Sequence, residues 1–503
     1  MGLWNLNGFT FNPADLTDFL KKKSVYRFLN SDFTKRFLKK YLETENGFTG
    51  LERLIQKYGS DERGFSKRLL EDRETLIPYI IFEYVCKIFK IDKKNLADCI
   101  RDPKIRKSVL NVAETIVEFG VQEPLIFAQP LMIVWNITYG CNLRCKHCYQ
   151  DAGILSRTKF TELNRDEKIM VMEEIVKTNI PTFAFAGGEP LIDPVFWDVA
   201  KIGKDAGLYM SINTNGTLIT EKIAEKLKEI GFAYYGVSID GASPETHDDF
   251  RGVKGAFEKA LNGIKNLIRV GEANKVCISF TVTRENKDDI EKIIRLRDEL
   301  GIRKVVFYNY IPCGRAGIEN DLSPFERESI FEIFYNDLKE KNNSLLSTAP
   351  QFGRYCRQMY ESHLGDCTVI GHFSSSAITQ LDNLAELIGG CGASRAYLAL
   401  QPDGSITPCV FMPDLKIGNI KKEGIISYEN LLNTWRHSGV LNRIRDRRFH
   451  PNHTGCNGKY FSVCGGCVAR IYAYTRDFAS CDPGCIYNCT QYEKIKSEVL
   501  GVV

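Results

Sequence analysis

The spacing of hydrophobic residues divides the chain into three regions with different predicted structures. In residues 10–125, apolar side chains recur every three or four positions, which is the period of a helix. Asp15 and Ser31 are residue types that begin helices by accepting hydrogen bonds from the first backbone amides. No alternating strand pattern is seen there, so this region is predicted to be helical.

Residues 130–320 alternate short apolar runs with amphipathic segments. Six runs have the length and composition of buried strands: Leu131–Ile137, Thr182–Ala186, Tyr209–Asn213, Ala233–Ile239, Val276–Val282 and Lys304–Tyr310. Helical patterns lie between them, for example at Arg165–Thr178, Glu221–Gly231, Ala256–Gly271 and Lys287–Leu300. Six such units predict a parallel sheet, either open or curled into part of a barrel.

The third region, from about residue 386 to the end, is rich in cysteines and turns and is predicted to contain little regular structure. The chain has 17 cysteines, of which eight fall between residues 391 and 489. The first 30 residues do not have the pattern of a signal peptide, and no apolar run is long enough to cross a membrane. The cysteines therefore indicate metal or cluster ligands in a reducing, cytoplasmic setting rather than disulfides.

Composition sets the class of protein. A chain of 503 residues with 44% hydrophobic and 26% charged residues is expected to form two or three globular domains. The net charge of +4 is too small to indicate a nucleic-acid partner.

Three cysteines follow the first predicted strand as Cys141-x3-Cys145-x2-Cys148. In parallel α/β folds, ligands bind beyond the carboxyl ends of the strands. A loop at that edge can fold three thiolates around one four-iron ([4Fe–4S]) cluster and leave one iron open to a small molecule. The alternative is a zinc ion with His147 as its fourth ligand, or three buried thiols.

This loop resembles the cluster loop of the radical S-adenosylmethionine (SAM) superfamily, in which an aromatic residue precedes the third cysteine; here His147 takes that position, followed by Tyr149. The resemblance covers residues 131–320 and implies a partial (β/α)6 TIM-type barrel. It implies that Cys141, Cys145 and Cys148 hold the catalytic cluster. It also implies reductive cleavage of SAM to a 5′-deoxyadenosyl radical, which abstracts hydrogen from an unactivated C–H bond, and an electron donor of the ferredoxin or flavodoxin type.

Three further motifs follow the next strands in the family's order, and the resemblance implies that they bind SAM. The second strand is followed by a GGEP motif, in which glycines let the backbone approach closely and the glutamate can accept from the SAM ammonium. The third and fourth strands end in NTNG and SIDG, which resemble the ribose and carboxylate contacts. The implied SAM-binding residues are His147, Tyr149, Gly187, Gly188, Glu189, Pro190, Asn213, Asn215, Ser238 and Asp240.

The C-terminal cysteines resemble the SPASM extension of this superfamily, which carries one or two auxiliary four-iron clusters. The resemblance rests on Gly404-x4-Cys409, on the CGGC at 464–467 and on the DPGC at 482–485. It makes these cysteines candidate ligands: Cys391, Cys409, Cys456, Cys464, Cys467, Cys481, Cys485 and Cys489.

The spacing of the cysteines does not show which of them would bind which cluster. Lys459 stands where the family often has a second thiolate after Cys456. A zinc ribbon made by Cys464, Cys467, Cys481 and Cys485 is the alternative. Cys313 and Cys356 lie at or after the end of the barrel, where a thiol can reach the substrate.

The substrate is the least constrained part of the prediction. Leu16–Leu42 is basic and amphipathic, a pattern that favours anionic membrane surfaces, although a helix packed on the barrel with a solvated basic face would look the same. The whole chain also resembles archaeal-type radical SAM/SPASM proteins related to lipid-bridging synthases, through Val134–Asn136 and Tyr149–Gly153. The leading hypothesis is therefore C–C bond formation between hydrocarbon chains of archaeal membrane lipids, with peripheral membrane contact.

Two other hypotheses stay open. One is a maturase for a peptide or an enzyme that modifies a tetrapyrrole, which the CGGC…DPGC ending motivates. The other is an iron–sulfur or zinc protein without catalysis. The predicted domains are a helical domain (1–125), the radical SAM partial barrel (126–320), a connecting region (321–385) and the SPASM-type auxiliary cluster domain (386–503).

Overall fold

The computed structural model forms two compact units, Met1–Ala128 and Gln129–Val503. It describes residues 4–6, 9–11, 22–45, 48–59, 101–153, 161–341, 345–362, 368–370, 373–375, 389–446, 459–488 and 492. Of the predicted features, Asp15, Cys456 and Cys489 lie outside these residues. No helix in the described part of the chain is long and apolar enough to cross a bilayer.

The first unit contains mainly helices: α2 (Lys22–Leu29), α3 (Asp32–Leu42), α4 (Gly50–Gly59) and α8 (Pro103–Glu118). Ser31 begins α3 as predicted, because its side chain accepts a hydrogen bond from the Thr34 amide. Helix α3 packs on α8 through its buried face, which includes Leu38. The hydrophobic pattern did not predict two short hairpins, β1 (Trp4–Leu6) with β2 (Phe9–Phe11), and β3 (Thr44–Glu45) with β4 (Phe48–Thr49).

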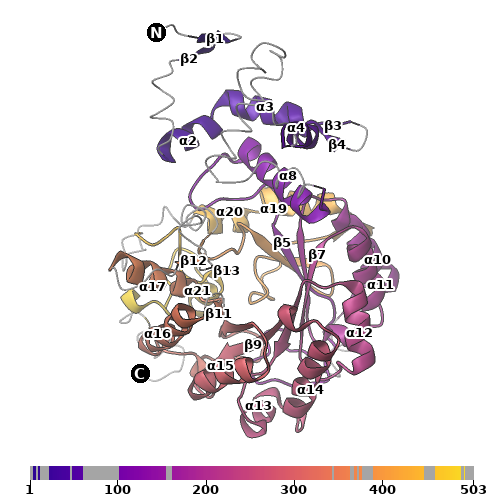
Figure 1. Cartoon of the computed structure of the whole chain (residues 1–503), viewed down its shortest axis with the longest axis vertical. Coiled ribbons are helices and arrows are strands. Elements are labelled where there is room, and N and C mark those ends of the chain that lie inside the picture. Colours follow the sequence, from indigo (N-terminus) through magenta and orange to yellow (C-terminus); the bar gives the residue numbers. More distant parts are fainter. Residues whose placement is uncertain are drawn as a thin grey trace. The chain divides into compact units, whose positions relative to one another are not determined.

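The second unit is built on six parallel strands in chain order (Figure 1). They are β5 (Met132–Asn136), β6 (Thr182–Ala186), β7 (Tyr209–Thr214), β8 (Tyr234–Ser238), β9 (Val276–Val282) and β10 (Lys304–Asn309). All six predicted strands are confirmed, each to within one residue at either end. The partial (β/α)6 barrel is confirmed with them, since each strand pairs in parallel with the next.

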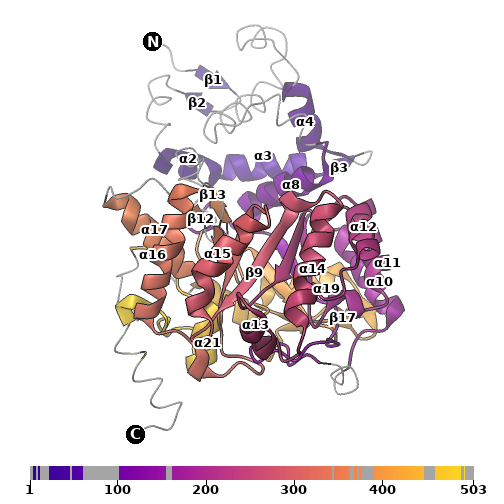
Figure 2. The ribbon, with the colours of Figure 1, turned by 60° about the horizontal axis from the view of Figure 1, so that its bottom comes forward.

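Helices cover the outer side of these strands, as Figures 1 and 2 show. They are α10 (Arg165–Val176), α11 (Phe196–Asp205), α12 (Glu221–Ile230), α13 (Pro244–Arg251), α14 (Ala256–Arg269) and α15 (Ile290–Glu299). Local sequence sets their ends: Asn164 and Glu167 form a reciprocal capping box at the start of α10. Gly231 ends α12 in the left-handed conformation, with φ of 81°, which other residues adopt at a cost.

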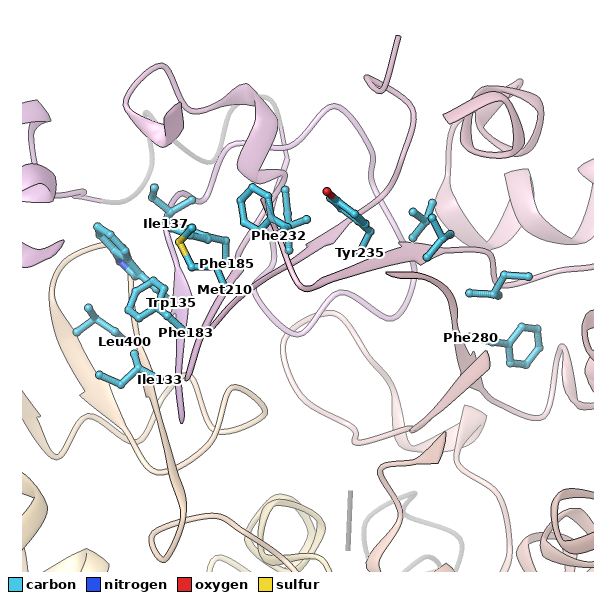
Figure 3. Packing of buried hydrophobic residues seen from close by; sticks show 14 of the residues in the cluster. Ile133, Trp135, Ile137, Phe183, Phe185, Met210, Phe232, Tyr235, Phe280 and Leu400 are labelled. Atoms are coloured by element: carbon cyan, nitrogen blue, oxygen red, sulfur yellow. The ribbon is translucent and has the colours of Figure 1, made fainter. Parts of the chain in front are cut away.

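The core lies between the strands and these helices (Figure 3). Alternate residues of β5, including Ile133 and Trp135, point into it and are fully buried. Trp135 pairs in register with Phe185 of β6, and the two rings lie 6.4 Å apart. Because side chains alternate along a strand, the intervening residues, such as Asn136, face the barrel interior, where polar chemistry is placed.

The prediction of little regular structure after residue 386 is wrong. Strand β14 (Tyr397–Leu400) pairs in parallel with β5, and β15 (Ser405–Thr407) and β16 (Gly418–Asn419) continue the sheet. Short strands that add to an open barrel edge satisfy its backbone hydrogen bonds, which hydrophobic spacing alone does not predict. Three helices follow, α19 (Tyr428–His437), α20 (Gly439–Arg445) and α21 (Val468–Thr475).

The predicted connecting region also has regular structure. Strand β11 (Leu345–Ser347) pairs in parallel with β10 at the other edge of the sheet. It is flanked by α16 (Pro324–Glu340) and α17 (Pro350–Glu361). Short hairpins complete the unit, β12 (Thr368–Ile370) with β13 (Phe373–Ser375) and β17 (Lys421–Lys422) with β18 (Ile425–Ile426). Single 3₁₀ turns occur at Pro190–Ile192, Ala273–Lys275, Lys287–Asp289, Ile318–Asn320 and Ile486–Asn488.

Candidate active site

The three cysteines of the predicted cluster loop lie together after β5. Cys141 and Cys145 are buried, Cys148 is half-buried, and all three pack in one small group that includes Leu143 and Ala152. The backbone amide of Leu143 donates to Cys141 Sγ over 3.4 Å, and that of Ala152 donates to Cys148 Sγ over 3.3 Å. Amide donors of this kind stabilise cluster-bound thiolates and tune the cluster's potential.

The burial of these thiols means that their thiolate forms need a cationic partner. Burial, with the nearby carboxylate of Glu189, raises the pKa of Cys141 to about 12, and burial raises that of Cys145. Without iron both thiols would therefore stay protonated at neutral pH, whereas coordination requires the thiolate. Three convergent thiols with amide donors fit a four-iron cluster that has one open iron.

The glycines of the GGEP motif hold their loop against the cluster loop. Gly188 donates its amide to Thr138 O over 2.7 Å, and the Glu189 amide donates to Gly140 O over 2.8 Å. A Cβ on Gly188 would lie 2.0 Å from Gly140 O, and one on Gly187 would lie 2.8 Å from Thr138 O. Gly187 also has φ of 129°, so side chains are excluded at both positions. The motif thus fixes the position of the cluster loop as well as presenting Glu189.

Glu189 is fully buried and is held at the carboxyl end of β6 by three donors. Its Oε1 accepts from Thr214 Oγ1 over 2.7 Å and from the Leu191 amide over 3.2 Å, and its Oε2 accepts from the Asn215 amide over 2.8 Å. Burial raises the pKa of Glu189 even though these hydrogen bonds oppose the shift. A buried carboxyl of this kind suits the ammonium group that the GGEP motif is predicted to bind.

The NTNG segment lies beside the cluster loop. Asn215 Nδ2 donates to Asn142 Oδ1 over 2.8 Å and lies 4.0 Å from Cys141 Sγ. Asn213 accepts from the Tyr308 hydroxyl over 3.2 Å. Tyr149, also a predicted site residue, donates its hydroxyl to Asn136 Oδ1 over 2.9 Å. The structure therefore brings Asn215 close to the cluster cysteines and places Asn213 and Tyr149 in the barrel interior.

Asp240 follows β8 and takes part in a buried ionic network. It pairs with Arg251, and its Oδ2 lies 3.6 Å from His147 Nε2. Arg251 Nη1 in turn lies 3.6 Å from Cys145 Sγ. Burial and the nearby guanidinium groups lower the pKa of His147 well below its usual value, so this imidazole is neutral. Ser238, the last residue of β8, is half-buried.

Two arginines that sequence reasoning missed fix the cluster loop. Arg251 ends α13, and its carbonyl accepts from the Arg144 amide over 3.1 Å. Arg315, after β10, donates to Cys145 O over 3.1 Å and to Ala152 O over 2.8 Å. Neither residue lies in a recognisable motif, so no sequence signal distinguished them from other arginines.

Five of the described auxiliary cysteines fall into two groups, and Cys481 is buried outside these packing clusters. Cys409 and Cys467 share one buried packing cluster, with Cys391 against it. Cys464 packs elsewhere, with Tyr460 and Val463, and its strongest thiol interaction is with Cys485. The two cysteines of the CGGC motif therefore face different groups, which disfavours the zinc ribbon that would need both on one ion.

A group of buried charges links the barrel to the auxiliary cysteines. Arg470 of α21 is fully buried and contacts Asp321, Asp482, Asn309 and the Tyr310 carbonyl. Asp482, from the DPGC motif, accepts from the Cys467 amide over 2.6 Å. The arginine and aspartate of the C-terminal motif therefore join the end of β10 to a cysteine backbone.

Within the described part of the chain, no three histidine, cysteine or carboxylate side chains are grouped tightly enough to hold a single metal ion. A four-iron cluster is wider than one ion, so its thiolates stand farther apart than those of a mononuclear site.

Comparisons with known proteins define the class of protein. Residues 135–297 match the family model "Radical SAM superfamily". The AdoMet-dependent heme synthase of Methanosarcina barkeri is 34% identical over 71% of this chain and 97% of the relative. The pre-heme d1 synthase of Dinoroseobacter shibae is 35% identical over 70% of this chain and 85% of the relative. SuiB of Streptococcus suis, a solved structure, covers 87% of this chain and 93% of its own, with a TM-score of 0.57 and 16% identity, which shows a shared fold.

The chain belongs to the radical SAM superfamily. Its relatives are SPASM-type members, so it is an enzyme that uses SAM, a catalytic four-iron cluster and one or two auxiliary four-iron clusters. The roles assigned above to individual cysteines and SAM-binding residues stay predictions.

Proposed function

We propose that this enzyme generates a 5′-deoxyadenosyl radical at Cys141, Cys145 and Cys148 and uses it to form C–C bonds between hydrocarbon chains of membrane lipids. A four-iron cluster held by these cysteines and reduced by a small electron-transfer protein would supply the electron that splits SAM into methionine and that radical. The chain's own residues bind and orient SAM: Glu189 is placed for its ammonium group, and the GGEP loop holds the cluster loop in register.

The observation that carries the lipid substrate is the surface of the first unit. Helix α3 exposes Arg36, Lys39 and Lys40, with one acidic residue, Asp32, in its first turn. In the same unit α8 exposes Ile105 and Val112, which are seven residues apart and so lie on one helix face. Cations with exposed apolar side chains are the features with which a protein binds an anionic lipid surface.

A part of this chain lies outside its match to the heme synthase, which supports an additional role for that part. The M. barkeri heme synthase is matched over almost its whole length by 71% of this chain, so the remainder has no counterpart in that enzyme. An enzyme that acts on a membrane lipid would require a surface that binds the membrane, which an enzyme that acts on a small soluble substrate does not need.

A tetrapyrrole is the second candidate substrate. It is favoured by two relatives that are at least 34% identical, both named for heme-type products. The same radical site would serve it, because hydrogen abstraction depends on the cluster and on SAM, and substrate choice depends on the walls of the barrel.

One assay distinguishes the two candidates. The full chain, reconstituted anaerobically with iron and sulfide and supplied with SAM and a reductant, is incubated with vesicles of isoprenoid diether lipid or with iron-coproporphyrin. Stimulation of 5′-deoxyadenosine by the vesicles, with loss of hydrogen from the lipid chains, supports the proposal. Stimulation by the porphyrin alone overturns it in favour of the second candidate.

A charge-reversed variant serves as the matched control. Lys39→Glu with Lys40→Glu changes only exposed residues of α3, far in sequence from the cluster loop. We expect it to lose vesicle stimulation while its basal SAM cleavage is unchanged. If vesicle stimulation persists in this variant, the basic surface of α3 does not bind the lipid.

A further inference from the structure

Four described cysteines from three separate segments meet in one packing cluster. Cys409 and Cys467 are core members of this cluster, and Cys313 and Cys391 both pack against it. Three of the four belong to the C-terminal cysteine motifs. Cys313 does not: it lies four residues after β10, in the second unit's barrel.

The position of Cys313 is fixed by the cluster loop. The amide of Arg315 donates to Cys148 O over 3.0 Å, and the amide of Ala316 donates to Cys313 O over 3.0 Å. Gly314, with φ of 63°, packs so closely on this loop that a Cβ there would lie 2.3 Å from Cys148 O. The turn that carries Cys313 is therefore held against the catalytic cluster loop on one side and the auxiliary cysteines on the other.

The surroundings of Cys313 include its three partner thiols. Cys409 and Cys467 are buried, and Cys313 and Cys391 are half-buried. Cys409 and Cys467 are among the groups that act electrostatically on the Cys313 thiol, and Cys391 and Cys467 are among those that act on Cys409. Thiols that converge from separate segments into one packing cluster have the arrangement with which cysteines hold a four-iron cluster.

We infer that Cys313 is the fourth thiolate of the auxiliary cluster held by Cys391, Cys409 and Cys467. The inference rests on the presence of an auxiliary cluster and is independent of the substrate. Four thiolates saturate the four irons, so this cluster has no open iron and serves electron transfer or structure rather than substrate binding. Cys313 also ties this cluster to the loop that carries Cys148, so the two clusters are fixed relative to each other by a single turn.

The alternative for Cys313 is a thiol that faces the substrate, and the two assignments differ in iron binding. To isolate the auxiliary iron, the three cluster-loop cysteines are first replaced by alanine in the full chain. Iron and sulfide are then counted, and Mössbauer and EPR spectra recorded, for this parent and for the same chain with Cys313→Ala. A substrate thiol leaves the auxiliary iron and its spectra unchanged, which would overturn the inference.

A fourth ligand gives a different result. We expect Cys313→Ala to lose about one to four irons per chain, or to show the EPR signal of a three-iron cluster in the oxidised state. Cys313→Ser, which can bind iron through oxygen, is expected to keep more iron with a shifted signal. Cys277→Ala is the matched control, because Cys277 is a buried thiol of β9 whose main electrostatic neighbours are Tyr234, Lys304 and Arg297; it should leave the iron count unchanged.

Selenocysteine at position 313 tests the same assignment without disturbing the fold. Selenium replaces sulfur with almost no change of shape, so folding is not at issue. With selenium-77, a resolved hyperfine coupling in the reduced auxiliary cluster's EPR signal is expected. Its absence, in protein with a full iron count, would refute ligation by Cys313 while leaving the lipid proposal unaffected.

Discussion

Replacing Arg470 tests whether the buried charges join the barrel to the auxiliary region. Arg470 and Arg327 together balance Asp321 and Asp482, and all four side chains are buried. Arg470→Met keeps an unbranched side chain but leaves two aspartates facing one arginine. Breaking a buried ion pair from one side costs about 3–5 kcal/mol, because the remaining charge loses its partner without regaining water.

The measurement is the thermal unfolding midpoint of the anaerobically reconstituted chain, with iron release recorded in the same scan. A loss of about 3–5 kcal/mol corresponds to a fall in Tm of roughly 4–6 °C in a unit of this size. Because Asp482 also accepts from the Cys467 amide, we expect auxiliary iron to be released at the lower temperature.

Arg476→Met is the matched control. Arg476 follows the same helix and pairs with Asp414 over 2.7 Å, but both side chains are more than half exposed. Exposed pairs contribute about 0–1 kcal/mol, so its Tm should fall by no more than about 2 °C. Equal midpoints for the Arg470 and Arg476 variants would refute the reasoning, since they would show that the buried group adds no more than a surface pair.

Three other predictions test the site. Cys141→Ala should abolish reductive SAM cleavage, whereas Cys464→Ala should lose auxiliary iron and keep some cleavage; 5′-deoxyadenosine and iron assays check both, and cleavage by the first variant would disprove the cluster assignment. Gly188→Ala should lose SAM cleavage at least tenfold, because its Cβ would lie 2.0 Å from a cluster-loop carbonyl, whereas Gly439→Ala, with open space around it, should not. Burial lowers the pKa of His247 to about 4 from its usual 6.5, so the unfolded chain binds a proton that the native chain does not between these values. The free energy of unfolding should therefore fall as the pH drops from about 6.5 to 4, and it should fall less in His247→Asn. Denaturant titrations at several pH values measure this, and an equal fall in the two proteins would contradict the prediction.

The sequence by itself determined the barrel and the chemistry. Buried parallel strands are continuous apolar runs, and α10, α12 and α13 each begin at a capping side chain, so the six units could be identified locally. The cluster chemistry was equally local, since Cys141, Cys145 and Cys148 fall in one loop and Glu189 in one motif.

Only the tertiary structure decided which distant residues meet. Arg251 and Arg315 hold the cluster loop from separate segments, and β14 joins the barrel beside β5 although more than 250 residues separate them in the chain. The division of Cys464 from Cys467, two neighbours in one motif, follows from the turn between them and from the segments packed on either side. The spacing of residues along the chain shows which side chains can lie on one face of a helix or strand. Contacts between distant segments depend on how their buried surfaces pack, and no local pattern encodes that packing.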